Sequence, residues 1–113
     1  MTKDLFYLEN ILDSIRILKK HTKNKQSVDL ENSVLLKDAV SKRLEEIGEN
    51  MNKLSLAIKK KNKQVKWESF IESRNFLSHI YQMVNVNKLW MIIVKEIPLL
   101  EKQIKDIIKE VKK

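Results

Sequence analysis

The chain has 113 residues, which is enough to bury one hydrophobic core but not two. It contains a single glycine and a single proline, and this composition argues against a β-rich fold because hairpins and tight turns depend on these residues. The absence of cysteine excludes disulfides and thiolate metal sites. The formal net charge of +8 favours RNA, DNA or an acidic protein as a partner, although lysine-rich composition also keeps small helical proteins soluble.

The apolar residues recur at steps of three and four, which predicts amphipathic helices throughout. A polar loop at residues 21–27 separates the first helix from the second, for which Asp29, Asn32 or Ser33 is a suitable N-cap. The four main helices span approximately residues 3–21, 29–58, 67–83 and 88–111. The sequence therefore predicts one all-α domain over residues 1–113, an antiparallel bundle of four main helices.

Two residues inside the predicted helices are exceptions to good helix formation. Gly48 costs up to ~1 kcal/mol relative to alanine, and either a close approach of another backbone or a tolerated weakness explains it. Pro98 removes the hydrogen bond to the carbonyl of Val94, so we expect the last helix to kink near it. The charged residues 109–113 are expected to fray.

The N-terminus lacks the uninterrupted apolar run of a signal peptide. The most apolar stretch, residues 89–94, is too short to span a bilayer. We therefore expect a cytoplasmic protein with no membrane contact.

A lysine-rich segment, residues 59–66, follows the second predicted helix and breaks its apolar stripe. Its five basic residues are Lys59, Lys60, Lys61, Lys63 and Lys66. One interpretation is a solvated helix end whose cations complement the helix dipole. The other is a rim that attracts phosphates and contacts RNA.

The third predicted helix contains the chemically densest stretch of the chain, residues 74–81. On a helical wheel at ~100° per residue with Arg74 at zero, Tyr81 lies at about −20°, and Ser78 at about 40°. Asn75 lies at about 100° and His79 at about 140° on the same wheel, while the apolar residues occupy the opposite arc. The polar groups therefore share one face of the helix.

This face has the groups that cleavage of an RNA phosphodiester bond requires. His79 can take the proton of a 2′-hydroxyl or protonate the leaving oxygen, and Arg74 can clamp the phosphate oxygens. Asn75 and Ser78 can orient the substrate or the imidazole. Such a reaction needs no metal or cofactor, and it makes RNA the substrate. A polar network at an interface is the equally simple alternative.

The geometry of one helix suits this chemistry poorly. Arg74 and His79 are separated by about 7.5 Å along the axis and point in divergent directions. Two copies related by a twofold axis can interleave both pairs in one cleft. We therefore expect a homodimer with a shared site. No metal site is expected, since Glu45, Glu46 and Glu49 have no histidine at ligand spacing on their helix.

The motif Arg74-x4-His79-x-Tyr81 resembles the R-x4-H-x-Y signature of HEPN-domain proteins, specifically the HepT-like toxins. Stretches in residues 38–49, and Trp67, Trp90 and Pro98, are also similar to that family, so the resemblance covers about residues 4–108. Position 80 departs from it, with isoleucine where relatives often carry glycine.

The resemblance implies a dimeric HEPN-like helical bundle with Arg74 and His79 in a ribonuclease cleft. It also implies the toxin of a toxin-antitoxin pair, silenced when an MntA-like nucleotidyltransferase antitoxin transfers AMP to Tyr81. Two alternatives stay open: a catalytically silent HEPN subunit that binds a nucleotidyltransferase, and a basic helical protein that binds nucleic acid without cleaving it.

Overall fold

The computed structural model describes residues 3–77 and 85–113, and for residues 74–77 it describes the backbone alone. These residues form helices and no strand, which confirms the predicted all-α class. Within these ranges no helix combines the length and apolar character needed to cross a membrane. The helices are α1 (Lys3–Thr22), α2 (Ser27–Glu31), α3 (Val34–Lys53), α4 (Leu56–Lys61), α5 (Trp67–Leu77), α7 (Val86–Met91), the π-helix η1 (Ile92–Glu96) and α8 (Ile97–Lys112).

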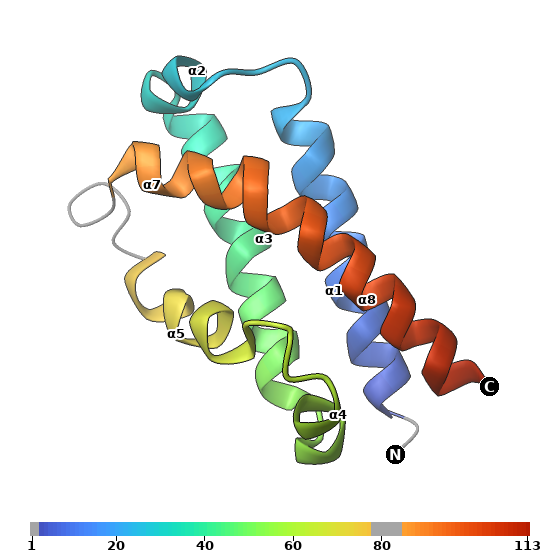
Figure 1. Cartoon of the computed structure of the whole chain (residues 1–113). Helices are drawn as coiled ribbons and strands as arrows, with labels where there is room; N and C mark the ends of the chain where they lie inside the picture. Colours follow the sequence, from blue (N-terminus) through green and yellow to red (C-terminus); the bar gives the residue numbers. More distant parts are fainter. Residues whose placement is uncertain (1–2, 78–84) are drawn as a thin grey trace.

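The long helices form an antiparallel bundle around α3. Helix α3 packs against α1 on one side and against α5 on the other, and α8 runs back along α1. Figure 1 shows α1 rising from the N-terminus and α8 descending beside it to the C-terminus. The four main helices predicted from the sequence therefore correspond to α1, α3, α5 and the α7–η1–α8 course.

The core contains the residues that the periodic stripes singled out. The buried stripe of α1 includes Leu8 and Ile15, and that of α8 includes Ile97 and Ile104, all inaccessible to solvent. Trp67 and Phe70 bring α5 into the same core. Burying side chains of this size contributes roughly 1.5–3 kcal/mol each, so these stripes are the main source of the bundle's stability.

The predicted polar loop is confirmed at residues 23–26, but a short helix, α2, follows it before the second long helix begins. Helix α2 begins at Ser27, where the Asp29 carboxylate accepts a hydrogen bond from the backbone N–H of Gln26 at 2.7 Å. Ser33 is the N-cap of α3, because its hydroxyl accepts from the backbone N–H of Leu36 at 3.0 Å. Of the three suggested caps, Ser33 is the one at which the long helix begins.

The second predicted helix ends earlier than its apolar stripe. Helix α3 ends at Lys53, and after the extended residue Leu54 a separate helix α4 starts with Ser55 as its N-cap. The Asp4 carboxylate accepts two hydrogen bonds from Ser55, from the backbone N–H at 2.9 Å and from the hydroxyl at 2.6 Å. This contact ties the start of α1 to the corner between α3 and α4.

The irregularity expected near Pro98 takes the form of a π-turn. Because proline has no N–H to donate to Val94, the backbone changes register just before it. The N–H of Ile97 reaches back five residues to the carbonyl of Ile92, and Pro98 lies in the first turn of α8. Helix α8 then continues to Lys112, through most of the segment 109–113 expected to fray.

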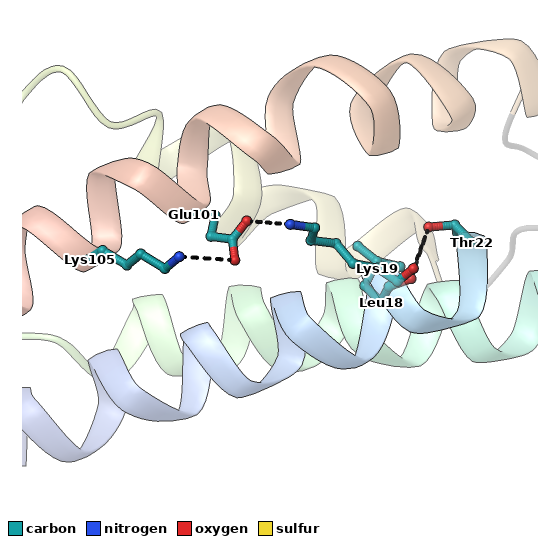
Figure 2. A network of polar contacts seen from close by, with 5 residues as sticks. All are labelled: Leu18, Lys19, Thr22, Glu101 and Lys105. Carbon is teal, nitrogen blue, oxygen red and sulfur yellow. Dashed lines mark hydrogen bonds and ion pairs between the residues drawn. The ribbon is translucent and has the colours of Figure 1, made fainter. Parts of the chain in front are cut away.

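A small network of charges joins α1 to α8 (Figure 2). The Lys19 ammonium lies 2.7 Å from one carboxylate oxygen of Glu101, and the Lys105 ammonium lies 3.5 Å from the other. The hydrogen bond from Lys19, with the positive charges of both lysines, holds the pKa of Glu101 below its ordinary value despite partial burial. The network therefore adds a charge-dependent contact to the apolar packing of α1 on α8.

Candidate functional site

Helix α5 carries the start of the chemically dense stretch, and two kinds of contact position it. Its first residue, Trp67, is buried and donates its indole N–H to the carbonyl of Asn62 at 2.9 Å. Phe70 and Ile71 are also buried, as α5 packs against α3. Within α5 the buried Ser73 hydroxyl donates to the carbonyl of Phe70 at 2.8 Å. The backbone leading to Arg74 is therefore held by the core.

The predicted site residues fall into two groups. Arg74 and Asn75 lie in α5, as the sequence predicts, but only their backbone is described. Ser78, His79 and Tyr81 lie outside the described residues. The distances among these five side chains, and their roles, therefore stay predictions.

A cleft of about 310 Å³ opens beside α5, immediately before Arg74. Its lining residues come from α5, from α7 and η1, and from Leu44 of α3. They are Ser69, Phe70, Glu72, Ser73, Lys88, Met91, Ile92, Glu96 and Leu44. A second hollow of about 380 Å³ lies between the η1–α8 region and α5 with the residues just before it. It shares three lining residues with the first cleft. The described part of α5 thus borders a groove along the turns that precede Arg74.

The groove combines an apolar floor with charges of both signs. Glu72 and Glu96 contribute carboxylates, and Lys88 contributes an ammonium. The sequence did not single out these three residues, because each reads as an ordinary exposed position on an amphipathic helix. Only the folded arrangement, in which α5 lines one cleft together with α7 and η1, brings them to one place. The groove can accept a polar chain with apolar parts, or a second protein surface.

The lysines of the lysine-rich segment, residues 59–66, lie in two different surroundings. Lys59, Lys60 and Lys61 form the last turn of α4, where cations complement the helix dipole. The Lys59 ammonium also donates to the carbonyl of Met51 near the end of α3 at 3.2 Å. Lys59, Lys63 and Lys66 line a groove of about 350 Å³ between α4 and the start of α5, and Lys60 and Lys61 do not line it.

Among the residues that the structure describes, no three histidine, aspartate or glutamate side chains gather into a cluster able to hold a metal ion. Glu46 instead pairs with Arg43 of the same helix at 2.8 Å.

The described helices form an all-α bundle with Arg74 on α5, and His79 follows five residues later in the sequence, as the motif resemblance requires. The comparison with protein families gives the particular assignment. The family model described as "Ribonuclease HepT-like" matches residues 11–107. The chain belongs to the HepT-like ribonuclease family, as the motif resemblance indicated.

Individual relatives agree with this assignment. The chain is 36% identical, over its whole length, to a "Gamma-glutamylcyclotransferase and putative RNase" of Methanocaldococcus jannaschii, but it spans only 51% of that protein. It is 36% identical to a "Putative RNase" of Caldanaerobacter subterraneus over 94% of this chain and 95% of the relative. It is 28% identical to a "Probable ribonuclease HepT" of Thermococcus cleftensis over 84% of this chain and 86% of the relative. No solved structure matches the chain significantly.

Proposed function

We propose that this protein is a metal-independent endoribonuclease, the toxin of a toxin-antitoxin pair, whose active site is shared between two copies of the chain. The observation that carries the proposal is the spacing of Arg74 and His79 in the sequence of a chain that belongs to the HepT-like ribonuclease family. The names of the relatives, which describe RNases, support the same chemistry.

The proposed reaction uses the RNA's own 2′-hydroxyl as nucleophile. His79 takes the hydroxyl proton, the 2′-oxygen forms a bond to phosphorus, and the bond from phosphorus to the 5′-oxygen breaks. The imidazolium of His79 then gives this proton to the leaving 5′-oxygen. The products are a 2′,3′-cyclic phosphate and a free 5′-hydroxyl. Arg74 stabilises the charge that develops on the non-bridging oxygens, and Asn75 and Ser78 orient the reacting groups.

Dimerisation is supported by the surface beside α5 as well as by the helical wheel. Met91 and Val94 are 43% and 44% exposed although both are apolar, and Met91 lines the groove that borders α5. Burying such side chains against a second copy gains roughly 25 cal/mol per Å² of apolar surface. A twofold axis near this groove would bring the two α5 helices together and would give each cleft Arg74 of one copy and His79 of the other.

Control of the site is proposed to act through Tyr81. An MntA-like nucleotidyltransferase antitoxin would transfer AMP from ATP to the tyrosine oxygen and release pyrophosphate. The adenylate brings a phosphate to the neighbourhood of Arg74, where it competes with the RNA phosphate for the guanidinium. This proposal rests on the resemblance in the motif, and it places the inhibitor in the same cleft as the substrate.

The test is cleavage of RNA by the purified protein in the presence of EDTA, with wild type, His79→Ala and Arg74→Ala compared. We expect cleavage by wild type alone, with cyclic phosphate ends and no cleavage of a 2′-deoxy substrate. If all three proteins bind RNA and none cleaves it, the chain is a silent HEPN subunit or a nucleic-acid-binding protein instead. Equal cleavage by all three would mean that the activity comes from elsewhere.

A further inference from the structure

The positive charge of this protein is distributed unevenly among its helices. Three lysines of α8 have acidic partners: Lys102 lies 3.2 Å from Asp106, Lys105 lies 3.5 Å from Glu101, and Lys112 lies 3.8 Å from Glu9 of α1. The segment 59–66 contains five lysines and no acidic residue, and its exposed lysines form no ion pair with any described residue. Uncompensated positive charge is therefore dense at the corner between α4 and α5, where five of eight consecutive residues are lysines.

This corner is hollowed rather than convex. The groove of about 350 Å³ has Lys59 and Lys63 on the α4 side and Lys66 just before α5. Leu56, which is 69% exposed, provides an apolar patch in the same groove. Glu68 also lines it and opposes part of the positive charge, but three lysines outweigh one carboxylate. Clusters of cations around a concave surface raise the local concentration of polyanions.

The groove and the candidate site are placed by the same helix. The buried Trp67, whose indole bonds to the carbonyl of Asn62, joins the lysine segment to the first turn of α5. Seven residues separate Trp67 from Arg74, which is about 10 Å along a helix. A single-stranded RNA that lies in the groove can therefore continue along α5 to Arg74.

We propose that the groove formed by Lys59, Lys63 and Lys66 is a secondary binding site for the RNA backbone, separate from the cleavage site. It holds a single-stranded flank of the substrate a few nucleotides from the bond that is cut. Lys63 and Lys66 make the phosphate contacts, while Lys59, held by its bond to the Met51 carbonyl, adds a fixed positive charge. Sugar or base surface packs against Leu56. This inference rests on the proposed ribonuclease function only for its second half, the coupling to cleavage.

The experiment compares wild type with Lys63→Gln/Lys66→Gln and with a control, Lys102→Gln/Lys112→Gln. Both variants lose two charges, so their net charge is equal, but the control removes lysines that already have acidic partners. Binding is measured with a fluorescent single-stranded RNA of about a dozen nucleotides, a length suited to one such groove. The RNA is 2′-O-methylated, so binding is recorded without cleavage.

We expect the groove variant to bind about tenfold more weakly at 0.1 M salt, with the salt dependence of log K reduced by about 1.4, the value for two lost phosphate contacts on a single strand. The control should change affinity less than about twofold. Equal affinities for the two variants would overturn the groove assignment, and unchanged RNA binding with lost binding of an acidic protein would assign the groove to a protein instead.

Cleavage separates this inference from the proposed function. With unmodified RNA of the same length, kcat/KM of the groove variant should fall about as much as affinity falls, whereas cleavage of a dinucleotide should be unchanged. If no form of the protein cleaves RNA but the groove variant still binds weakly, the proposed ribonuclease function fails and the binding groove stands. If wild type cleaves and both variants bind and cleave alike, the groove fails and the ribonuclease function stands.

Discussion

The contact between Asp4 and Ser55 gives a sharp test of how the bundle is held together, because it joins residues 51 positions apart through one carboxylate. Hydrogen bonds to a charged group contribute about 1.5–3 kcal/mol each when enclosed, and here two such bonds lie in a partly buried place. Allowing for the remaining access of water, we expect Asp4→Ala to lower the free energy of unfolding by about 2 kcal/mol. For a domain of this size that corresponds to a fall in Tm of about 8 °C.

The assay is urea unfolding at one fixed protein concentration, with Asp4→Ala, Ser55→Ala and the double variant forming a cycle. Ser55→Ala also removes the N-cap of α4, whose hydroxyl accepts from Ile58 at 3.3 Å. The double-mutant cycle cancels the cost of losing the N-cap, and we expect a coupling energy between Asp4 and Ser55 of about 1 kcal/mol. Asp13→Ala is the control, since Asp13 is exposed on the same helix and pairs with Arg16 only at 3.8 Å. A coupling energy near zero, or an equal loss for Asp13→Ala, would refute the structural role of the contact.

Three further predictions concern stability and control. Glu101→Gln should lower the free energy of unfolding by about 0.5 kcal/mol at pH 7. Because folding lowers the pKa of this carboxyl from 4.5, the difference from wild type in urea unfolding should be complete above that pH and shrink below it. A constant difference down to pH 3 would contradict the pairing with Lys19. Gly48 is buried in α3, so Gly48→Leu should destabilise by about 1–3 kcal/mol in thermal unfolding, whereas an exposed site would tolerate it. Tyr81→Phe should abolish the added AMP mass when the protein is mixed with its antitoxin and ATP, and an unchanged adenylate would place the modification elsewhere.

The sequence predicted the helices that bury continuous apolar stripes, because a period of 3.6 residues directly reports burial. It failed where tertiary contacts decide the backbone. The stripe of the second helix continues to Ile58, so periodicity could not reveal the break at Ser55, which is bonded to Asp4 from the opposite end of the chain. Helix α2 was missed because its five residues are too few to show a period. Pro98 did indicate an irregular turn, but not that the change would be a π-turn before it.

The candidate site divides in a similar way. Local sequence places Arg74 and Asn75 on α5, since the helical periodicity of the residues around them predicts a helix that begins near Trp67. The groove lined by Glu72, Lys88 and Glu96 could not be predicted, because these residues come together only when α5 folds against α7 and η1. Likewise, a run of lysines does not reveal that Lys59 bonds to the Met51 carbonyl.

The shared ribonuclease site is tested most directly by mixing two inactive variants. Arg74→Ala and His79→Ala, each inactive alone in EDTA, are combined under conditions that allow subunits to exchange. If each cleft takes its arginine from one copy and its histidine from the other, the mixed dimers have one complete pair, and about a quarter of wild-type cleavage should return. A mixture that stays inactive, although mass measurement shows that mixed dimers have formed, would contradict a site shared in this way.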